Sequence, residues 1–419
     1  MMSLRACRDT GMRAVGVVRF HAPDALSISR HHSMLEERKM HSRLPAIRLL
    51  RPRLARLPAT MMLFTITACS TGGRSASDTT TAMRTDTTTR ADSLGGMSGS
   101  VRASTEQAKV LDELAALGGK PLDTLSPEEA RRQPTPADAV KRLLQKNEAS
   151  VAPEAVGKVA NRTIAGPGGV LPVRIYTPAG TGPFPVIVYF HGGGFVIATI
   201  DTYDSSARAL ANAAGAVVMS VEYRKGPEHK FPAAHDDAYA AYLWAVRNAS
   251  QIGGDSTRIA LVGESAGGNL ALATAMQVRD STGVRAPVSI VAVYPVVGSD
   301  TTTESYTRNA LAKPLNRPIM TWFFRHYTRS SADATDPRLN IVGADLKGLP
   351  PVTIISAEID PLLSEGEQLT SKLRDAGVTV SQRMWPGTAH EFFGQGAVLP
   401  AAKEAVQYAA DALKASFRK

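Results

Sequence analysis

One serine in this 419-residue sequence stands in a context suited to nucleophilic chemistry. Residues 263–267 read GESAG, directly after the apolar run RIALV and at the start of the helix-forming run AGGNLALATAM. A G-x-S-x-G pattern is weak alone, but with a strand before it and a helix after it the pattern predicts a nucleophile elbow. Gly263 and Gly267 leave room for the tight turn, and the helix N-terminus favours negative charge developing near Ser265. The pattern therefore predicts Ser265 as a nucleophile.

A serine hydroxyl is a poor nucleophile at neutral pH and needs a base. On such an elbow the serine is followed in the chain by its acid and then by its histidine. Only His326 and His390 lie downstream of Ser265. His326 lies in WFFRHYTR at helical spacing, which favours packing or a surface position. His390 lies in the loop WPGTAHEFFG, before the last helix, and is the predicted base.

The segment SAEIDPLLSEG offers the orienting acid. Its three carboxylates are Glu358, Asp360 and Glu365. We expect Glu358 to lie within the strand PVTIISAE and Glu365 to lie in the first turn of the next helix. Asp360 follows the strand and precedes Pro361, which helps to end it. Asp360 is therefore predicted to orient His390.

The glycines of HGGGF follow the apolar run PVIVYF and call for a separate explanation. A phosphate-binding loop needs a later Gly-Lys-Ser/Thr, and a dinucleotide fingerprint needs G-x-G-x-x-G opening a helix, so neither pattern fits. A loop of this composition after an early strand is typical of an oxyanion hole. Gly193 and Gly194 are predicted to donate their N–H groups, with that of Ala266 as the third. Gly192 is expected to serve the turn and His191 to hold the loop.

The elements around these residues predict an α/β architecture. From residue 171 onward, strand-like Val/Ile runs alternate with helical stretches, which is typical of a mostly parallel sheet with helices on both faces. Residues 299–347 break this rhythm, and an insertion of this length is expected to be functional. Four aromatic residues of the insertion are interpreted either as the lining of an acyl pocket or as packing within a cap. They are Trp322, Phe323, Phe324 and Tyr327.

Together these motifs resemble the hormone-sensitive lipase family of α/β-hydrolases, also called bacterial family IV esterases. The matching stretches are HGGGF, VEYRKGPEHKFPAAHDDA, GESAGGNLA, DPLLSEG and GTAHEFF, and the similarity covers about residues 105–419. The resemblance implies an α/β-hydrolase fold, a carboxylester hydrolase without a cofactor, and a cap from about 105–150 and 299–347. The family usually reads YRLAPEH where this chain reads YRKGPEH, so Lys225 and Gly226 put the local packing in question.

The chain also holds polar residues that we interpret as structural. The stretch PEHKFPAAHDDA lacks a third ligand at a known metal spacing, so no metal is expected there. Its His and Asp residues are expected to be solvated; they are His229, His235, Asp236 and Asp237. Glu264 stands where aspartate or threonine is common in the family, and we interpret it as a supporting residue.

The predicted function is that of a serine carboxylester hydrolase on short-to-medium acyl esters, with an acyl-enzyme intermediate and a small-molecule ester as substrate. An amidase or peptidase stays open, because it would share the elbow and the triad. The HGGG loop favours esters. A non-catalytic receptor on the same scaffold is disfavoured, because Ser265, Asp360 and His390 are all present. The sequence leaves a homodimer open.

The net charge of +10 does not indicate a nucleic-acid partner. Residues 1–68 carry twelve Lys/Arg against four Asp/Glu, and the rest of the chain carries 36 against 34. The basic excess therefore lies in the leader, and the body lacks the charge that nucleic-acid binding needs.

The leader resembles a bacterial lipoprotein signal. A basic stretch, RPRLARLP, is followed by the apolar ATMMLFTIT and then by ITAC, which ends at Cys69. The apolar run is too short to span a bilayer. The resemblance implies export, cleavage before Cys69, and a lipid anchor on that residue at the periplasmic or outer side of a membrane. Residues 69–104 are rich in Ser, Thr and Gly and predict a flexible tether. Met40 is an alternative start, and a mis-annotated leader would instead leave the protein in the cytoplasm.

Overall fold

The computed structural model describes residues 102–419. The expected leader 1–68, Cys69 and the tether up to residue 101 lie outside the described residues. The described chain forms one eight-stranded sheet in the order β1-β2-β4-β3-β5-β6-β7-β8. The strands are β1 Lys158–Gly166, β2 Gly169–Thr177, β3 Phe184–Phe190, β4 Val217–Val221, β5 Gly254–Glu264, β6 Ile290–Val293, β7 Val352–Ile359 and β8 Val380–Ala389.

The sheet is mostly parallel, as the alternation of strands and helices predicts. β1 and β2 pair antiparallel, and β2 pairs antiparallel with β4. From β4 across to β8 every neighbouring pair is parallel. Strand β1 was not predicted from the sequence, and its residues are mostly exposed apart from Ile164. An exposed edge strand carries no continuous apolar run, so the signal that marks the central strands is missing there.

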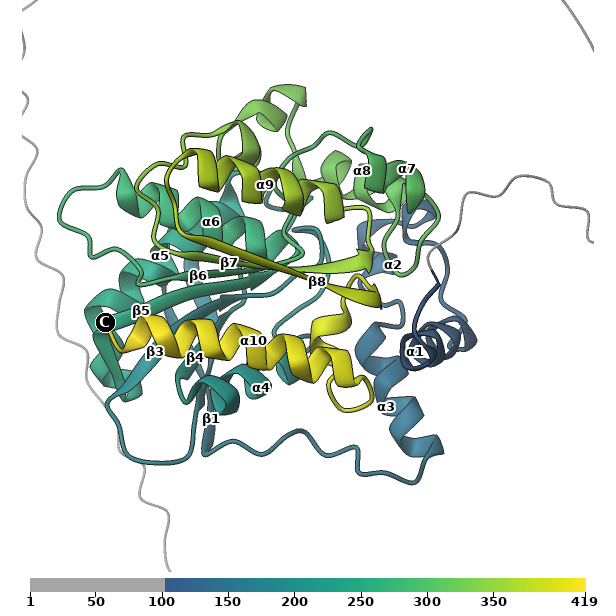
Figure 1. Ribbon diagram of the computed structural model, residues 1–419, viewed down its shortest axis with the longest axis horizontal. Coiled ribbons are helices and arrows are strands. Elements are labelled where there is room, and N and C mark those ends of the chain that lie inside the picture. The colour runs from purple at the N-terminus through teal and green to yellow at the C-terminus, as the bar shows by residue number, and fades with distance from the viewer. Residues whose placement is uncertain (1–101) are drawn as a thin grey trace, which may run out of the picture. The chain divides into compact units, whose positions relative to one another are not determined.

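Helices cover both faces of the sheet. Side chains alternate between the two faces along each strand, so an apolar run such as β3 presents apolar side chains to both faces. Val186, Val188 and Phe190 of β3 join the core under α5, α6 and α9, whereas Ile187 and Tyr189 join the core under α4 and α10. Figure 1 shows these helices on opposite sides of the strands. The longer helices are α1 Thr105–Ala116, α3 Pro136–Lys146, α4 Asp204–Ala214, α5 Ala233–Asn248, α6 Ala266–Arg279, α8 Arg317–Tyr327, α9 Leu363–Asp375 and α10 Pro400–Phe417.

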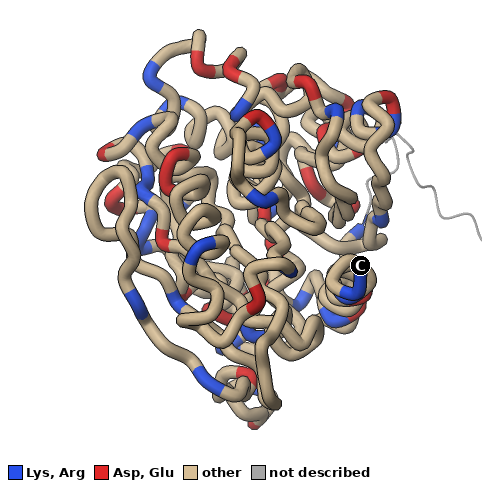
Figure 2. The backbone as a smooth tube through the Cα atoms, turned by 90° about the vertical axis from the view of Figure 1, so that its left-hand side faces the viewer, with Lys and Arg blue, Asp and Glu red and all other residues tan. Residues whose placement is uncertain are grey.

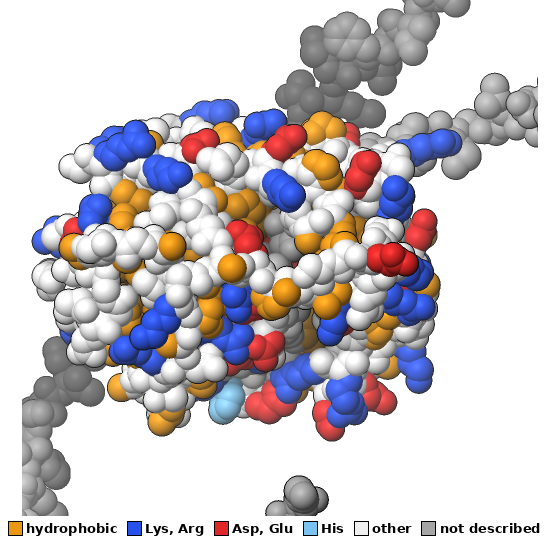
Figure 3. Space-filling view, turned by 90° about the horizontal axis from the view of Figure 1, so that it is seen from below, with side chains coloured by type: hydrophobic (Ala, Val, Ile, Leu, Met, Phe, Trp, Pro, Cys, Tyr) orange, Lys and Arg blue, Asp and Glu red, His pale blue; other side chains and the backbone are white. Residues whose placement is uncertain are grey.

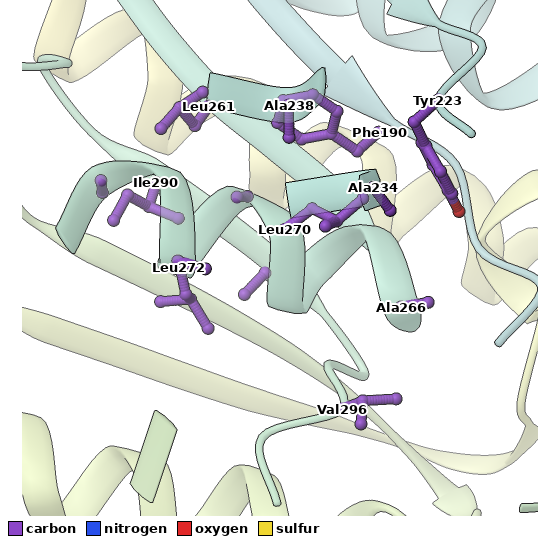
Figure 4. Packing of buried hydrophobic residues seen from close by; sticks show 14 of the residues in the cluster. Phe190, Tyr223, Ala234, Ala238, Leu261, Ala266, Leu270, Leu272, Ile290 and Val296 are labelled. Atoms are coloured by element: carbon purple, nitrogen blue, oxygen red, sulfur yellow. The ribbon is translucent and has the colours of Figure 1, made fainter. Parts of the chain in front are cut away.

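The larger core lies between the sheet and helices α5 and α6. Leu270 and Leu272 of α6 and Ala238 of α5 belong to the same buried cluster as Phe190 and Leu261 of the strands (Figure 4). Nearly all residues of α6 are buried. This packing holds the helix that begins directly after Ser265 against the centre of the sheet.

The short and amphipathic helices gather at the carboxyl ends of the parallel strands. α1, α3, α8 and the short helices α2 (Pro127–Ala130) and α7 (Glu304–Arg308) lie at the end toward which the arrows of β7 and β8 point (Figure 1). Ser104, just before α1, donates its N–H to the carbonyl of Gly387 in β8 at 2.9 Å. In open α/β sheets this edge is where ligands bind.

The surface of the described residues carries mixed charge. Figure 2 shows Lys and Arg interspersed with Asp and Glu along the backbone, and the face seen in Figure 3 has the same mixture between scattered apolar side chains. Within residues 102–419, no helix is both long and apolar enough to cross a membrane.

Candidate active site

The GESAG stretch forms the turn between β5 and α6. Ser265 has φ 54° and ψ −117°, a conformation that few non-glycine residues adopt. A Cβ at Gly263 would collide with the carbonyl oxygen of Gly267, and a Cβ at Gly267 would collide with that of Phe190. The Ser265 N–H donates to the carbonyl of Val293 at 2.8 Å. The glycines are therefore required by the close approach of three backbone segments.

Ser265, His390 and Asp360 form a continuous chain of hydrogen bonds. The Nε2 atom of His390 lies 3.0 Å from Ser265 Oγ, and its Nδ1 atom lies 2.7 Å from Asp360 Oδ2. All three side chains are buried. Burial alone would lower the pKa of His390, but the adjacent Asp360 carboxylate outweighs it and raises that pKa above its ordinary 6.5. His326, the other downstream histidine, lies in α8 with its ring tilted against that of Trp322, with centroids 4.5 Å apart.

Of the three candidate acids, only Asp360 contacts His390. Asp360 follows β7, and its Oδ1 atom accepts the N–H of Leu362 at 2.9 Å. Asn309 donates to the Asp360 carbonyl at 3.0 Å. Glu358 lies within β7, where the sequence placed it, and its carboxylate accepts the N–H of Gly387. Glu365 lies in the first turn of α9, where burial raises its pKa to about 8.

The HGGGF loop presents free backbone donors beside the serine. Gly193 and Gly194 have φ values of 98° and 59°, which favour glycine. Within residues 102–419, neither N–H group has a hydrogen-bond acceptor. Both glycines line the same cavity as Ser265 and His390. Ala266 is the first residue of α6, directly after Ser265; it is fully buried and does not itself line the cavity.

The cavity above these residues has a volume of about 480 Å³. Its walls are mainly apolar and come from α1, the segment after it and α8. Of the four aromatic residues in the insertion, only Phe323 lines the cavity. Trp322 donates its Nε1–H to the Leu125 carbonyl at 3.0 Å, and Tyr327 bonds to His235. The packing interpretation therefore holds for Trp322 and Tyr327.

Comparison with known proteins agrees with this geometry. Residues 187–394 match the family described as alpha/beta hydrolase fold. Carboxylesterase NlhH of Mycobacterium tuberculosis (strain CDC 1551 / Oshkosh) is 40% identical over 250 residues, which cover 58% of this chain and 78% of the relative. Ethyl acetate hydrolase of Pseudomonas putida is 33% identical over 287 residues, 66% of this chain and 90% of the relative. This chain belongs to the α/β-hydrolase family.

The solved structures lead to the same family. A hyperthermophilic esterase from Pyrobaculum calidifontis superposes with a TM-score of 0.69 at 36% identity and covers 75% of this chain and 98% of its own. The predicted fold class is confirmed, and this α/β-hydrolase is an enzyme of the carboxylesterase type.

His191 is fully buried in this α/β-hydrolase. Its Nδ1 atom lies 2.8 Å from the Gly192 carbonyl, and its ring stacks on Tyr223 with centroids 4.3 Å apart. Burial lowers the pKa of His191 to about 4, so the ring is neutral at neutral pH. Gly192 does not line the cavity, and a Cβ there would collide with the Tyr203 hydroxyl. These contacts fit a supporting part for both residues.

The expectation that the PEHKFPAAHDDA residues are solvated is wrong for two of them. His235 is buried and lies 2.8 Å from Asn269 Oδ1 and 2.9 Å from the Tyr327 hydroxyl. Asp237 is buried and paired with Arg224 at 2.8 Å. Both residues join separate elements, and a short sequence pattern gives no sign of such partners. Among the described residues, no group of three His, Cys, Asp or Glu residues is arranged to hold a metal ion.

Glu264 is a buried carboxylate under the elbow. The hydroxyls of Tyr189 and Tyr294 each donate to it at 2.5 Å. Burial raises its pKa to about 7. The Tyr294 ring also lies against His390, with centroids 4.4 Å apart. The interpretation of Glu264 as a supporting residue fits these contacts.

Three polar residues around the His390 loop were not predicted from the sequence. Gln107 of α1 is fully buried and accepts the Ala389 N–H at 3.1 Å. Its amide also donates to Gln395 at 3.2 Å. Tyr203 and Glu391 line the cavity beside His390. Gln107 lies 282 residues before Ala389, so no local pattern marks the pair. Glu391 directly follows His390 in the sequence, and this position alone could have identified it as a residue of the site.

Proposed function

We propose that this enzyme is a serine carboxylesterase of the hormone-sensitive lipase family that hydrolyses short-to-medium acyl esters. One observation carries the proposal: the Ser265–His390–Asp360 chain of hydrogen bonds ends at an apolar cavity beside the free N–H groups of Gly193 and Gly194. The names of the relatives, which include a carboxylesterase and an ethyl acetate hydrolase, support the same chemistry.

The proposed reaction has two halves. His390 Nε2 takes the proton of Ser265 as the serine Oγ attacks the ester carbonyl carbon. The N–H groups of Gly193, Gly194 and Ala266 stabilise the oxyanion. The imidazolium, held by Asp360, then protonates the departing alkoxide and leaves an acyl-enzyme. A water molecule, deprotonated by His390, releases the acid and restores the serine.

We propose that residues 105–150 and 299–347 act as a cap over the acyl chain. Support comes from the cavity walls, to which both segments contribute: Leu111 and Leu114 lie on one side, and Leu315 and Phe323 on the other. An apolar cavity of about 480 Å³ suits a short or medium chain within the usual range of ligand pockets.

A chain-length series tests the proposed activity. Wild-type protein should hydrolyse p-nitrophenyl esters of two to eight carbons, and Ser265→Ala should lower kcat by about 10⁴–10⁶-fold. Circular dichroism and the melting temperature serve as the folding control. Equal rates in the two proteins would contradict the proposal. A matched p-nitroanilide arm tests the amidase alternative, which requires amide cleavage at a comparable kcat/KM.

We also propose that the protein is an exported lipoprotein anchored through Cys69. The order of basic, apolar and small residues before this cysteine supports the proposal. In a bacterial host, labelled palmitate should enter the full chain but not the Cys69→Ala variant. Equal labelling of the two proteins, or none in either, would argue against the anchor.

A further inference from the structure

Glu391, the residue after His390, has an unusual backbone conformation. Its φ of 70° lies in the left-handed region, which is strained for a residue with a Cβ. Such conformations cluster at functional sites, where the surrounding structure holds them in place. The glutamate side chain is 21% exposed, and it lines the cavity together with His390 and Ser265.

One hydrogen bond holds the Glu391 carboxylate, and another holds the backbone that carries it. The Tyr203 hydroxyl donates to Oε1 of Glu391 at 2.5 Å, and the side-chain amide of Gln395 donates to the Glu391 carbonyl at 3.0 Å. Tyr203 fits there because Gly192 has no Cβ. The glutamate is therefore a fixed part of the cavity wall.

One oxygen of the carboxylate is left for a ligand. Oε1 is bonded to Tyr203, whereas Oε2 has no hydrogen-bond partner among residues 102–419. Nearby Glu264 and Asp360 are also acidic, and burial together with Asp360 raises the pKa of Glu391. Four cations line the same cavity: Lys120, Arg131, Lys225 and Lys313. Arg131 is paired with Glu228 and Lys225 with Glu222. The end of the cavity at His390 therefore favours a cationic ligand group.

The position of the carboxylate indicates which part of an ester it would meet. In the proposed reaction, His390 Nε2 protonates the leaving oxygen and must lie within hydrogen-bond distance of it. Oε1 of Glu391 lies 3.9 Å from the same Nε2 atom. The carbonyl oxygen is directed to the glycine N–H groups instead. The alcohol part of the ester is therefore the part beside Glu391.

We propose that Glu391 is a specificity-determining residue that selects esters whose alcohol part carries a positive charge two or three bonds from the ester oxygen. This inference rests on the proposed function. A fixed carboxylate that would otherwise lack a partner discriminates strongly between a charged group and a neutral group of the same shape. Amino-alcohol esters are the substrate class that fits.

Two esters of nearly equal shape test the selection. Acetylcholine and 3,3-dimethylbutyl acetate differ mainly in the charge of the trimethyl group. We expect kcat/KM to favour acetylcholine by at least about tenfold in the wild type, and Glu391→Gln to remove most of that preference. Choline and 3,3-dimethylbutanol can be compared in the same way as competitive inhibitors of p-nitrophenyl acetate hydrolysis. Choline should have the lower Ki in the wild type, and Glu391→Gln should remove most of that difference.

Two further variants keep the test sharp. Glu391→Gly removes the carboxylate and relieves the backbone strain, so it should fold at least as well as the wild type and lose the same preference. Glu404→Gln makes the same chemical change on the exposed face of α10, so this variant should keep the wild-type preference for acetylcholine. The inference would be overturned if the wild type hydrolyses p-nitrophenyl acetate but its kcat/KM for acetylcholine and for 3,3-dimethylbutyl acetate are nearly equal. It would also be overturned if the ratio of these two kcat/KM values is unchanged in both Glu391 variants. A wild type that does not hydrolyse p-nitrophenyl acetate would instead refute the proposed function, and the inference with it.

Discussion

At the scale of single residues, the site depends on buried charges whose neighbours set their protonation. Asp360 holds the pKa of His390 above 6.5, although burial acts in the opposite direction. In the proposed reaction, His390 must be neutral to accept the serine proton. By raising the pKa of His390, the Asp360 carboxylate that orients the imidazole also raises the pH below which the imidazole is protonated and cannot accept a proton.

The pH dependence of the reaction follows from this balance. We expect kcat/KM for p-nitrophenyl acetate to fall as pH decreases through a midpoint above 6.5, because His390 becomes protonated there. Asp360→Asn should lower the rate by about 10⁴-fold and move the midpoint to lower pH. A midpoint that does not move in the variant would contradict the assigned cause.

Glu365 provides a stability prediction at the same scale. Its pKa is about 8 in the folded protein and near 4.5 when unfolded, so the folded state binds its proton more tightly. The resulting stabilisation is complete below pH 4.5 and is lost as pH rises toward 8, by about 3–5 kcal/mol. Glu365→Gln does not titrate.

Urea unfolding between pH 5 and 9 measures this effect. Relative to the wild type, Glu365→Gln should gain stability steadily as pH rises. Glu367→Gln changes an exposed residue of the same helix and should follow the wild-type curve. If the free energy of unfolding varies with pH in the same way in all three proteins, Glu365 does not hold a proton in the folded state.

At the scale of elements, three loops at the carboxyl ends of β5, β7 and β8 bring Ser265, Asp360 and His390 together, and α1 holds the last of these loops. Gln107 bonds both to Ala389 and, through Gln395, to the segment that carries Glu391. A helix at the start of the described chain thereby positions the histidine loop near its end.

Loss of this contact should affect catalysis more than substrate binding. We expect Gln107→Ala to lower kcat about tenfold with a smaller change in KM, and to cost about 1–3 kcal/mol of stability, because a buried N–H loses its acceptor. Glu106→Ala, at the exposed neighbour in α1, is the matched control. If both variants retain the wild-type kcat, α1 has no part in positioning His390.

The elements that local sequence determines were predictable, and the contacts between distant ones were not. The turn around Ser265 was visible because its glycines are demanded by contacts within one strand-turn-helix unit and the strand beside it. The bond between Gln107 and Ala389, like the burial of His235, depends on how elements far apart in the chain meet. The strand β1 was missed because it is exposed on an edge.

At the scale of the whole molecule, the cavity is the space left between the carboxyl edge of the sheet and the helices gathered over it. Its size therefore depends on the side chains that face inward from those helices. Phe323 of α8 is the largest apolar example, and its ring lies directly against Gly194.

Trimming this ring should change the preferred substrate length. We expect Phe323→Ala to move the optimum of the p-nitrophenyl ester series toward longer acyl chains by about two carbons, because one aromatic ring occupies roughly the volume of several methylenes. Phe324→Ala, at a neighbour that does not line the cavity, should keep the wild-type optimum. An unchanged optimum in both variants would show that the acyl chain lies elsewhere.

The hydrogen bond between Ser104 and Gly387 has a practical consequence for anyone who wishes to attach this enzyme to a surface or a fusion partner. Ser104 is bonded to β8 three residues before His390, so a bulky domain joined immediately ahead of Ser104 would lie against the loop that carries His390. The C-terminal helix α10 ends at the opposite end of the sheet (Figure 1). Immobilisation through that terminus would leave the mouth of the cavity free.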